Sequence, residues 1–313
     1  MEGDFGSDSI QTMVVVLIGG YLTAGGANAI NMWYDRDIDP KMLRTSDRAI
    51  PSGRVEAGSA LFFGILISIL GVWWFYEMSN EVAAFWSAFS VLFYVLIYSI
   101  WLKRRTTQNI VIGGIAGSTP PVIGWSASSG DLFISTDSMA SVLESVIELG
   151  SLMPWFMFFL IFLWTPPHFW ALALYRSEEY AEVGVPMLPN VKGPERTLLE
   201  MKVYSILLVL LSLAAPTTLE EIKIEDWSYH VLSWTILGLG LWYASTVWRI
   251  DISEEPDETG RISSAATSFF VSMLYLALMF VVLVTGSFGK FGVVIGAITA
   301  TVFVTRTELK STT

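Results

Sequence analysis

The sequence predicts an all-α membrane protein, a polytopic bundle of transmembrane helices. Its 313 residues are 53% hydrophobic and only 15% charged, and the mean hydropathy is +0.56. Eight apolar runs of about 20 residues follow one another, and a helix of that length crosses the hydrocarbon core of a bilayer. We therefore expect residues 1–313 to form a single membrane domain rather than separate soluble domains.

The expected spans are joined by polar loops. A ninth apolar run, at residues 291–305, is shorter and follows Lys290 closely, so we expect it to be marginal as a span. The loop at residues 129–151 has acidic residues but no Lys or Arg, and we expect a surface helix in it. The eight clear spans are expected near residues 10–33, 58–77, 82–101, 109–128, 152–174, 203–219, 229–248 and 266–286.

The positive charges predict how the chain crosses the membrane. Lys and Arg gather in the loops after the first, third, fifth and seventh spans, whereas the opposite side has only Lys223 and Lys290. Loops rich in Lys and Arg remain in the cytoplasm. The alternation predicts a multi-pass protein of the cell membrane, with the N-terminus outside and all the polar motifs on the cytoplasmic face.

Composition also excludes several classes of site. The chain has no Cys, which rules out disulfides, thiolate zinc sites and iron–sulfur clusters. A net charge of −11 argues against binding to nucleic acid. The first nine residues, MEGDFGSDS, are acidic where a signal peptide would be positive, so no signal peptide is expected.

The first polar motif follows the first span. Asn31, Asp35 and Asp39 are spaced so that their side chains share one face of a helix, which Pro40 is expected to end at Asp39. Carboxylate and amide oxygens at a membrane lip suit Mg²⁺ bound to a substrate's phosphates. A solvated connector is the alternative reading. A calcium loop is rejected, because Pro40 stands where that loop needs Gly and Ser46 where it needs Glu.

Basic residues near this motif could hold phosphate oxygens. Arg48 and Arg54 follow it in the same loop, and Lys103 and Arg104 follow the third span, with Asn109 opening the next helix. The alternative is that these charges only set the topology. In the fourth span, Pro120 and Pro121 are expected to break or kink the helix. Gly113, Gly114 and Gly117 would permit close approach of a helix or a flat ligand.

A third motif closes the fifth span. His168 lies among aromatic residues, where a hydrogen-bonded structural role is the commoner one. Pro166 and Pro167 are expected to disrupt the helix beside it, and Trp164, Phe169 and Trp170 would suit a flat aromatic substrate. A second polar cluster at the cytoplasmic lip consists of Arg176, Glu178, Glu179 and Tyr180.

Three strings carry a resemblance to a known family. They are NAINMWYDRDIDPKMLRTSDRAIPSGR, LKRRTTQNIVIGGIAGSTPPVIGW and LWTPPHFWALALYRSEEYAEVGVPMLP. They resemble the UbiA superfamily of intramembrane prenyltransferases. The PPHFWALAL segment resembles the haem-modifying branch, the protohaem IX farnesyltransferases or haem O synthases. The resemblance covers residues from about 10 to 286.

The resemblance implies a helical bundle around a central cavity open to the cytoplasmic side. It implies a transferase with farnesyl diphosphate as donor, haem B as acceptor, haem O as product and Mg²⁺ as cofactor. Ionisation of the allylic C–O bond would yield a farnesyl cation, which a haem vinyl group captures. The metal residues implied are Asn31, Asp35 and Asp39. The catalytic residues implied are Asp35, Asp39, Lys103 and His168. The substrate-binding residues implied are Asn31, Arg48, Arg54, Lys103, Arg104, Asn109, His168, Arg176, Glu178 and Glu179.

Two points qualify this expectation. Family members usually begin with a further span, and this chain is expected to lack it.

Prenyl transfer to a quinone precursor or lipid is the alternative activity, and a membrane transporter is the alternative class. The partners expected besides the two substrates are the lipid bilayer and haem-pathway or oxidase-assembly proteins.

Overall fold

The computed structural model describes most of the chain, and the described part is helical with no β-strand. The helices form two compact units. One comprises Met1–Phe158 with Ser177–Val191, and the other comprises Phe159–Arg176 with Lys192–Thr313. That the whole chain is one domain stays a prediction. The described residues are 7–130, 132–175, 184–219, 226–254 and 262–311.

Eight described helices are long and apolar enough to cross a membrane, which confirms the all-α, multi-pass architecture. The ninth candidate is among them, because Gly289–Leu309 has the length of a full span. The eight helices are Ser9–Tyr34, Ala57–Met78, Glu81–Leu102, Asn109–Ser128, Met153–Tyr175, Trp227–Trp248, Ser263–Gly286 and Gly289–Leu309.

The sixth expected span, at residues 203–219, is not among these eight helices, and the helix found there differs from the expectation at both ends. Helix α10 occupies Pro194–Ser212 rather than residues 203–219, and a short 3₁₀ turn, Ala215–Thr218, follows it. Its start is explained by Pro194, because proline suits the first turn of a helix. Its end is explained by Pro216, whose ring would clash with the carbonyl of Ser212 in a continued helix.

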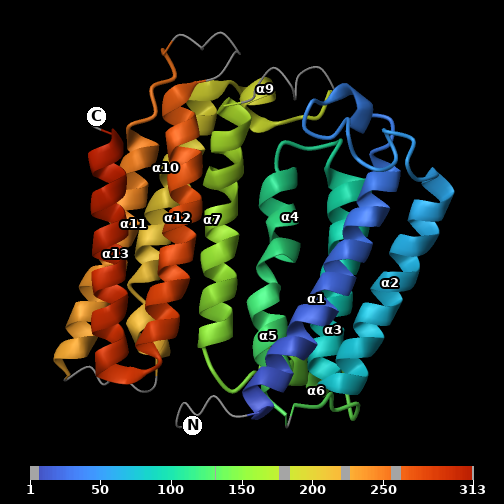
Figure 1. Cartoon of the computed structure of the whole chain (residues 1–313), viewed down its shortest axis with the longest axis horizontal. Helices are drawn as coiled ribbons and strands as arrows, with labels where there is room; N and C mark the ends of the chain where they lie inside the picture. Colours follow the sequence, from blue (N-terminus) through green and yellow to red (C-terminus); the bar gives the residue numbers. More distant parts are fainter. Residues whose placement is uncertain (1–6, 131, 176–183, 220–225, 255–261, 312–313) are drawn as a thin grey trace. The chain divides into compact units, whose positions relative to one another are not determined.

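In the first unit, α1 (Ser7–Tyr34) packs along α2 (Ala57–Met78), and Figure 1 shows the two side by side. Glycines permit this close approach. A Cβ at Gly26 would lie 2.7 Å from the Gly64 carbonyl oxygen, and a Cβ at Gly64 would lie 2.9 Å from the Gly26 carbonyl oxygen. The two backbones therefore meet where neither helix has a side chain, as in small-residue packing of membrane helices.

The third span changes helical form along its length. It is α-helical over Glu81–Leu92 (α3) and π-helical over Phe93–Leu102. The fourth span is broken as predicted, because α4 (Asn109–Ser118) and α5 (Pro120–Ser128) are separated at Thr119. A proline begins α5, where its missing N–H has no helical partner to lose.

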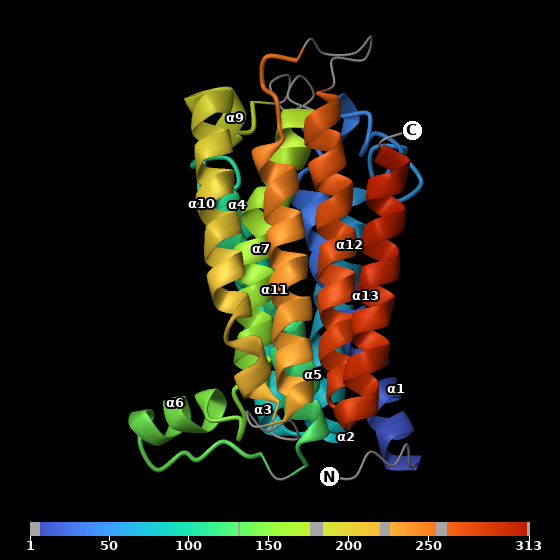
Figure 2. The same cartoon turned by 90° about the vertical axis from the view of Figure 1, so that its left-hand side faces the viewer.

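The expected surface helix is α6, Met139–Ile147, which lies across α3 and α5 at their ends rather than along them (Figure 2). Three tryptophan indoles from three different helices donate hydrogen bonds to backbone carbonyls at its C-terminal end. Those carbonyls have no partner within a helix, so the indoles satisfy groups that would otherwise be left unpaired. The bonds are Trp86 to Val146 at 2.9 Å, Trp155 to Ile147 at 3.0 Å and Trp125 to Leu149 at 3.1 Å.

In the second unit, α11 (Trp227–Trp248), α12 (Ser263–Gly286) and α13 (Gly289–Ser311) lie side by side, as Figure 2 shows. The greater part of α7 (Met153–Tyr175) also belongs to this unit. The expectation that Pro166 and Pro167 disrupt this helix is wrong, because α7 runs unbroken through both. Prolines are tolerated within membrane helices when the surroundings satisfy the freed backbone groups.

Candidate active site

The first motif residues lie at one end of the first unit, where α1 ends. Asn31 is in the last turn of α1, is 6% exposed, and accepts a hydrogen bond at its Oδ1 from Ser99 Oγ at 2.9 Å. The helix stops at Tyr34 rather than at Asp39, and Ile38 N bonds to the Asp35 carbonyl three residues earlier instead of continuing the α-helical pattern. Helix-like bonds continue beyond it, since Asp39 N donates to the Asp35 carbonyl at 2.9 Å. The two carboxylates therefore keep the one-turn spacing that the sequence predicts.

Asp35 is the most enclosed acid of the motif, with no exposed surface. Lys103 Nζ donates to its Oδ2. Its Oδ1 accepts no hydrogen bond, although the Arg104 guanidinium lies 3.5 Å away. A buried carboxylate oxygen without a donor is costly, and this one is aimed at the basic residues of the lip. Asp35 thus has one oxygen that remains to be satisfied.

Asp39 is held in a similar way by a different cation. It is 2% exposed, and Arg48 Nη1 donates to Oδ1 at 3.0 Å and to Oδ2 at 2.9 Å. Thr45 Oγ1 donates to the Asp39 backbone carbonyl at 2.9 Å, which folds the loop back over the acid. The structure thus brings Arg48 to the motif. Arg54 is directed elsewhere, toward the exposed carboxylate of Asp47 at 3.1 Å.

Arg104 makes the outer ion pair of the cluster, with Asp37. Both hydrogen bonds between the two side chains are 2.7 Å long, and Asp37 is more than half exposed. The guanidinium holds the pKa of Asp37 below its ordinary value, mainly through these hydrogen bonds. The guanidinium also lies over the Tyr34 ring, 4.7 Å from its centre, so Arg104 is fixed at the end of α1.

The π-helical end of the third span positions Lys103 and Ser99. Lys103 N bonds to the Tyr98 carbonyl five residues earlier at 2.8 Å, and Ser99 Oγ lies 2.9 Å from the Tyr94 carbonyl. π-helical turns are rare and often occur at functional sites. Asn109, 1% exposed, donates from Nδ2 to the Lys103 carbonyl at 3.2 Å. In the structure Asn109 therefore secures the basic loop.

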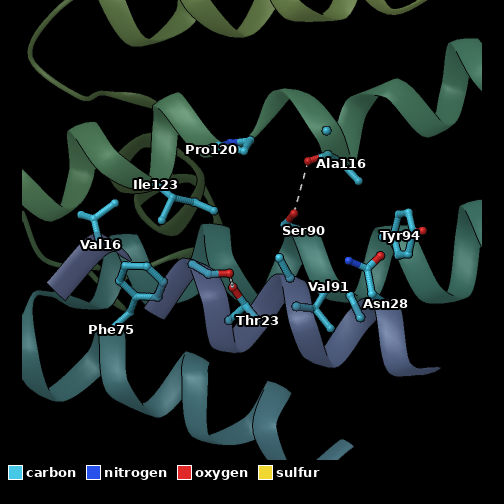
Figure 3. A pocket seen from close by; sticks show the side chains of 14 residues that line it. Val16, Thr23, Asn28, Phe75, Ser90, Val91, Tyr94, Ala116, Pro120 and Ile123 are labelled. Carbon is cyan, nitrogen blue, oxygen red and sulfur yellow. Dashed lines mark hydrogen bonds between the residues drawn. The ribbon is translucent and has the colours of Figure 1, made fainter. Parts of the chain in front are cut away.

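A cavity of about 250 Å³ lies in the same unit, between α1, the third span and α4–α5. Its lining is mostly apolar. Asn28 and Tyr94 stand at one end, and Val16 and Phe75 at the other (Figure 3). Asn28 precedes Asn31 by three residues on α1, so its end of the cavity is the one toward the acidic motif. The polar end of this apolar space thus lies about one helical turn from Asn31 and about two turns from the buried carboxylate of Asp35.

His168 belongs to the second unit and makes a separate cluster there. It is 7% exposed, and its ring stacks on Trp164 at 4.2 Å and on Phe269 at 4.6 Å between centres. Its Nδ1 lies 2.6 Å from Ser272 Oγ. That His168 shares one site with the acidic motif stays a prediction. Arg176, Glu178 and Glu179 lie outside the described residues.

Three residues of these clusters were not expected from the sequence. Ser99 and Ser272 are serines within apolar helices, and no local pattern marks either of them, because the contact of each depends on how two helices pack. Asn28 could have been found, because it shares the helical face of Asn31 and is a polar residue within an apolar span. Its position in the cavity makes it a candidate substrate contact.

Comparison with known proteins adds independent information. The chain matches the model of the UbiA prenyltransferase family over residues 3–264. It is 43% identical over 258 residues to the protoheme IX farnesyltransferase of Parvibaculum lavamentivorans, and the alignment covers 82% of this chain and 72% of that relative. It is 42% identical over 274 residues to the protoheme IX farnesyltransferase of Beijerinckia indica, and this alignment covers 88% of the chain and 77% of that relative.

Solved structures share the fold. A digeranylgeranylglyceryl phosphate synthase aligns with a TM-score of 0.65 at 17% identity, covering 89% of this chain and 86% of the other. A UbiA homolog from Aeropyrum pernix aligns with a TM-score of 0.61 at 19% identity, covering 89% and 90%. A UbiA homolog from Archaeoglobus fulgidus, solved with DMAPP and Mg²⁺, aligns with a TM-score of 0.54 at 17% identity, covering 87% and 88%.

Proposed function

The chain belongs to the UbiA prenyltransferase family, and from this premise we propose that it transfers a farnesyl group from farnesyl diphosphate to a vinyl group of haem B. Water completes the product, so that haem B, farnesyl diphosphate and water give haem O and diphosphate. The observation that carries the proposal is the match at 39–43% identity, over 82–88% of this chain, to relatives named protoheme IX farnesyltransferase.

The end of α1 would hold the diphosphate together with Mg²⁺. Asn31, Asp35 and Asp39 offer the hard oxygens that Mg²⁺ prefers, and Asp35 Oδ1, which accepts no hydrogen bond, would bind such a cation in place of the Arg104 guanidinium 3.5 Å away. Among the described residues, no three His, Cys, Asp or Glu side chains form a metal site by themselves. That agrees with a metal which one or two carboxylates share with phosphate oxygens. When bound, the cation would neutralise charge on the departing diphosphate.

The basic residues would bind the leaving group. Lys103 and Arg48 already lie against the two buried carboxylates, so each is within reach of an anion at the same place. Positive side chains fixed beside the departing diphosphate stabilise the negative charge that develops when the allylic C–O bond breaks. Arg54 and Arg104 lie in the neighbouring loops of the same unit and are proposed as further diphosphate contacts.

The apolar cavity would receive the prenyl chain. Its polar end, with Asn28 and Tyr94, leads toward the acidic motif, and its other end is lined by apolar side chains. An apolar wall excludes water, and water would otherwise capture the farnesyl cation before haem does. In this proposal, the cavity would supply the protection from water that the farnesyl cation needs.

His168 and its stacked aromatic neighbours are proposed as the contact for the flat haem ring, with Arg176, Glu178 and Glu179 as further substrate-binding residues. We place the protein in the cell membrane. The side of the first unit on which the C-terminal end of α1 lies would face the cytoplasm, because the Lys and Arg residues of the loops gather on that side. Haem-pathway or oxidase-assembly proteins are the proposed partners.

A product assay tests the function. The purified chain is incubated with Mg²⁺, haem B and farnesyl diphosphate, and the haem extract is analysed by mass spectrometry. The expected product is haem carrying one hydroxyethylfarnesyl group, absent when Mg²⁺ is chelated. Unmodified haem, with prenyl transfer to a quinone precursor supplied in parallel, would replace the proposal with the other branch of the family.

A further inference from the structure

The hydrogen bonds of Ser272 determine which nitrogen of His168 is free. Ser272 Oγ donates to the Phe269 carbonyl at 2.6 Å and lies 2.6 Å from His168 Nδ1. A serine hydroxyl has a single proton. The Phe269 carbonyl has no proton of its own, so a contact of 2.6 Å between two oxygen atoms is favourable only when the proton of Ser272 lies between them. The equally short contact with His168 Nδ1 then needs the proton of the histidine, which places that proton on Nδ1.

A neutral imidazole has one N–H, so this arrangement leaves the lone pair on Nε2. Both flat faces of the ring are covered, by Trp164 at an interplanar angle of 20° and by Phe269 at 23°. With Nδ1 bonded to Ser272, the only polar atom of the ring that remains available is Nε2. The cluster thus presents one basic nitrogen in a fixed direction.

Ser272 also fixes the neighbour that stacks on His168. Trp164 Nε1 donates to the Ser272 backbone carbonyl at 2.8 Å. Trp164 and His168 are one turn apart on α7. The backbone carbonyl of Ser272 binds the first ring and its hydroxyl binds the second, so a single residue on α12 fixes how the two rings stack. The side chain of Ser272 is fully buried, and no solvent competes for these bonds.

We infer that Ser272 is a positioning residue, which sets the Nδ1–H tautomer of His168 so that Nε2 is offered to the haem substrate. The inference rests on the proposed function for the identity of the substrate, whereas the tautomer itself does not. Hydrogen bonding of one ring nitrogen commonly determines what the other nitrogen of a histidine can bind.

The first test reads the tautomer directly. The chain has only two His residues, so the protein labelled with ¹⁵N-histidine gives few signals, and His230 serves as an internal reference. The full chain in nanodiscs should show His168 as Nδ1–H. Ser272→Ala should change that population, Ser272→Thr should retain it, and Ser268→Ala should leave it unaltered. Ser268 is the matched control, because it is equally buried one turn away on α12 and lies beside Thr246.

The second test reads the role. Loss of such a supporting hydrogen bond typically costs about tenfold or more in ligand affinity or activity, so Ser272→Ala should weaken haem B binding and transfer by about that factor, and Ser268→Ala should not. An Nε2–H tautomer in the unaltered chain, or the same tautomer in Ser272→Ala, would overturn the inference. So would a changed tautomer with unchanged haem binding. If the unaltered chain modifies no haem, the proposed function fails, while the tautomer measurement still decides what Ser272 does.

Discussion

Replacement of Asp35 by Asn gives the sharpest test of the acidic motif. The change keeps the shape of the side chain but removes its charge, and it leaves the Lys103 ammonium facing a neutral amide. Asp37→Asn is the matched control, because it makes the same change two residues away in an ion pair at the surface. Asp35 has no exposed surface, whereas the Asp37 side chain is 58% exposed.

The structure gives different magnitudes for the two variants. Removing one partner of a buried ion pair costs about 3–5 kcal/mol. The lower end applies at Asp35, because the Lys103 side chain keeps 17% of its surface exposed. A pair as exposed as Asp37 with Arg104 contributes at most about 1 kcal/mol. For transfer, loss of a metal-binding carboxylate worth about 4 kcal/mol in the transition state would slow the reaction about a thousandfold.

The assays are thermal unfolding in detergent, followed by tryptophan fluorescence, and farnesyl transfer to haem B. Asp35→Asn should unfold at clearly lower temperature and lose transfer, while Asp37→Asn should stay close to the unaltered chain in both. Transfer by Asp35→Asn within tenfold of the unaltered chain would refute the metal role. Equal destabilisation by the two variants would refute the reasoning from burial.

Two further predictions concern packing and pH. Gly64→Ala should destabilise the chain by about 1–3 kcal/mol, because its Cβ would strike the backbone of α1; Gly58→Ala, with no atom within 4 Å, should not, and equal unfolding temperatures would contradict this. Arg104 lowers the pKa of Asp37 below 3.8, so the stabilisation from that pair is complete above this value and disappears as the pH falls through the lower folded pKa. The stability difference between the unaltered chain and Asp37→Asn should therefore shrink as the pH falls from neutral through 3.8 and then through the lower folded pKa, and a constant difference would contradict it.

Much of the fold could be predicted from the sequence, because a membrane requires long apolar helices and the chain shows them plainly. The expected first span and the break at Pro120 are both present. Prolines were harder to interpret. Pro216 ends a helix, whereas Pro166 and Pro167 lie inside one, and the difference depends on whether neighbouring groups satisfy the freed carbonyls, which local sequence does not reveal.

The candidate site could be predicted in part, because residues spaced one helical turn apart can be recognised in the sequence. The spacing of Asn31, Asp35 and Asp39 predicted that three oxygen-bearing side chains would lie together, and the structure shows all three to be buried; their role as metal ligands stays a prediction. The sequence did not predict which basic side chain would form an ion pair with which of the two carboxylates. Lys103 reaches Asp35 across 68 residues of sequence, and it does so from the end of a π-helical turn, whose wider register no residue pattern announces.

The pairing of Asp35 with Lys103 and of Asp39 with Arg48 has a consequence for how ligands would bind. In a cluster whose opposite charges already neutralise each other, a divalent cation arriving alone would strip a basic side chain of its counter-ion. A diphosphate arriving alone would do the same to the carboxylates. Each ligand would thus leave an unpaired charge that the other ligand neutralises. By thermodynamic linkage, the metal raises the affinity for diphosphate by the same factor as diphosphate raises the affinity for the metal. The empty enzyme would hold neither one tightly, and metal and diphosphate would be recognised as a pair.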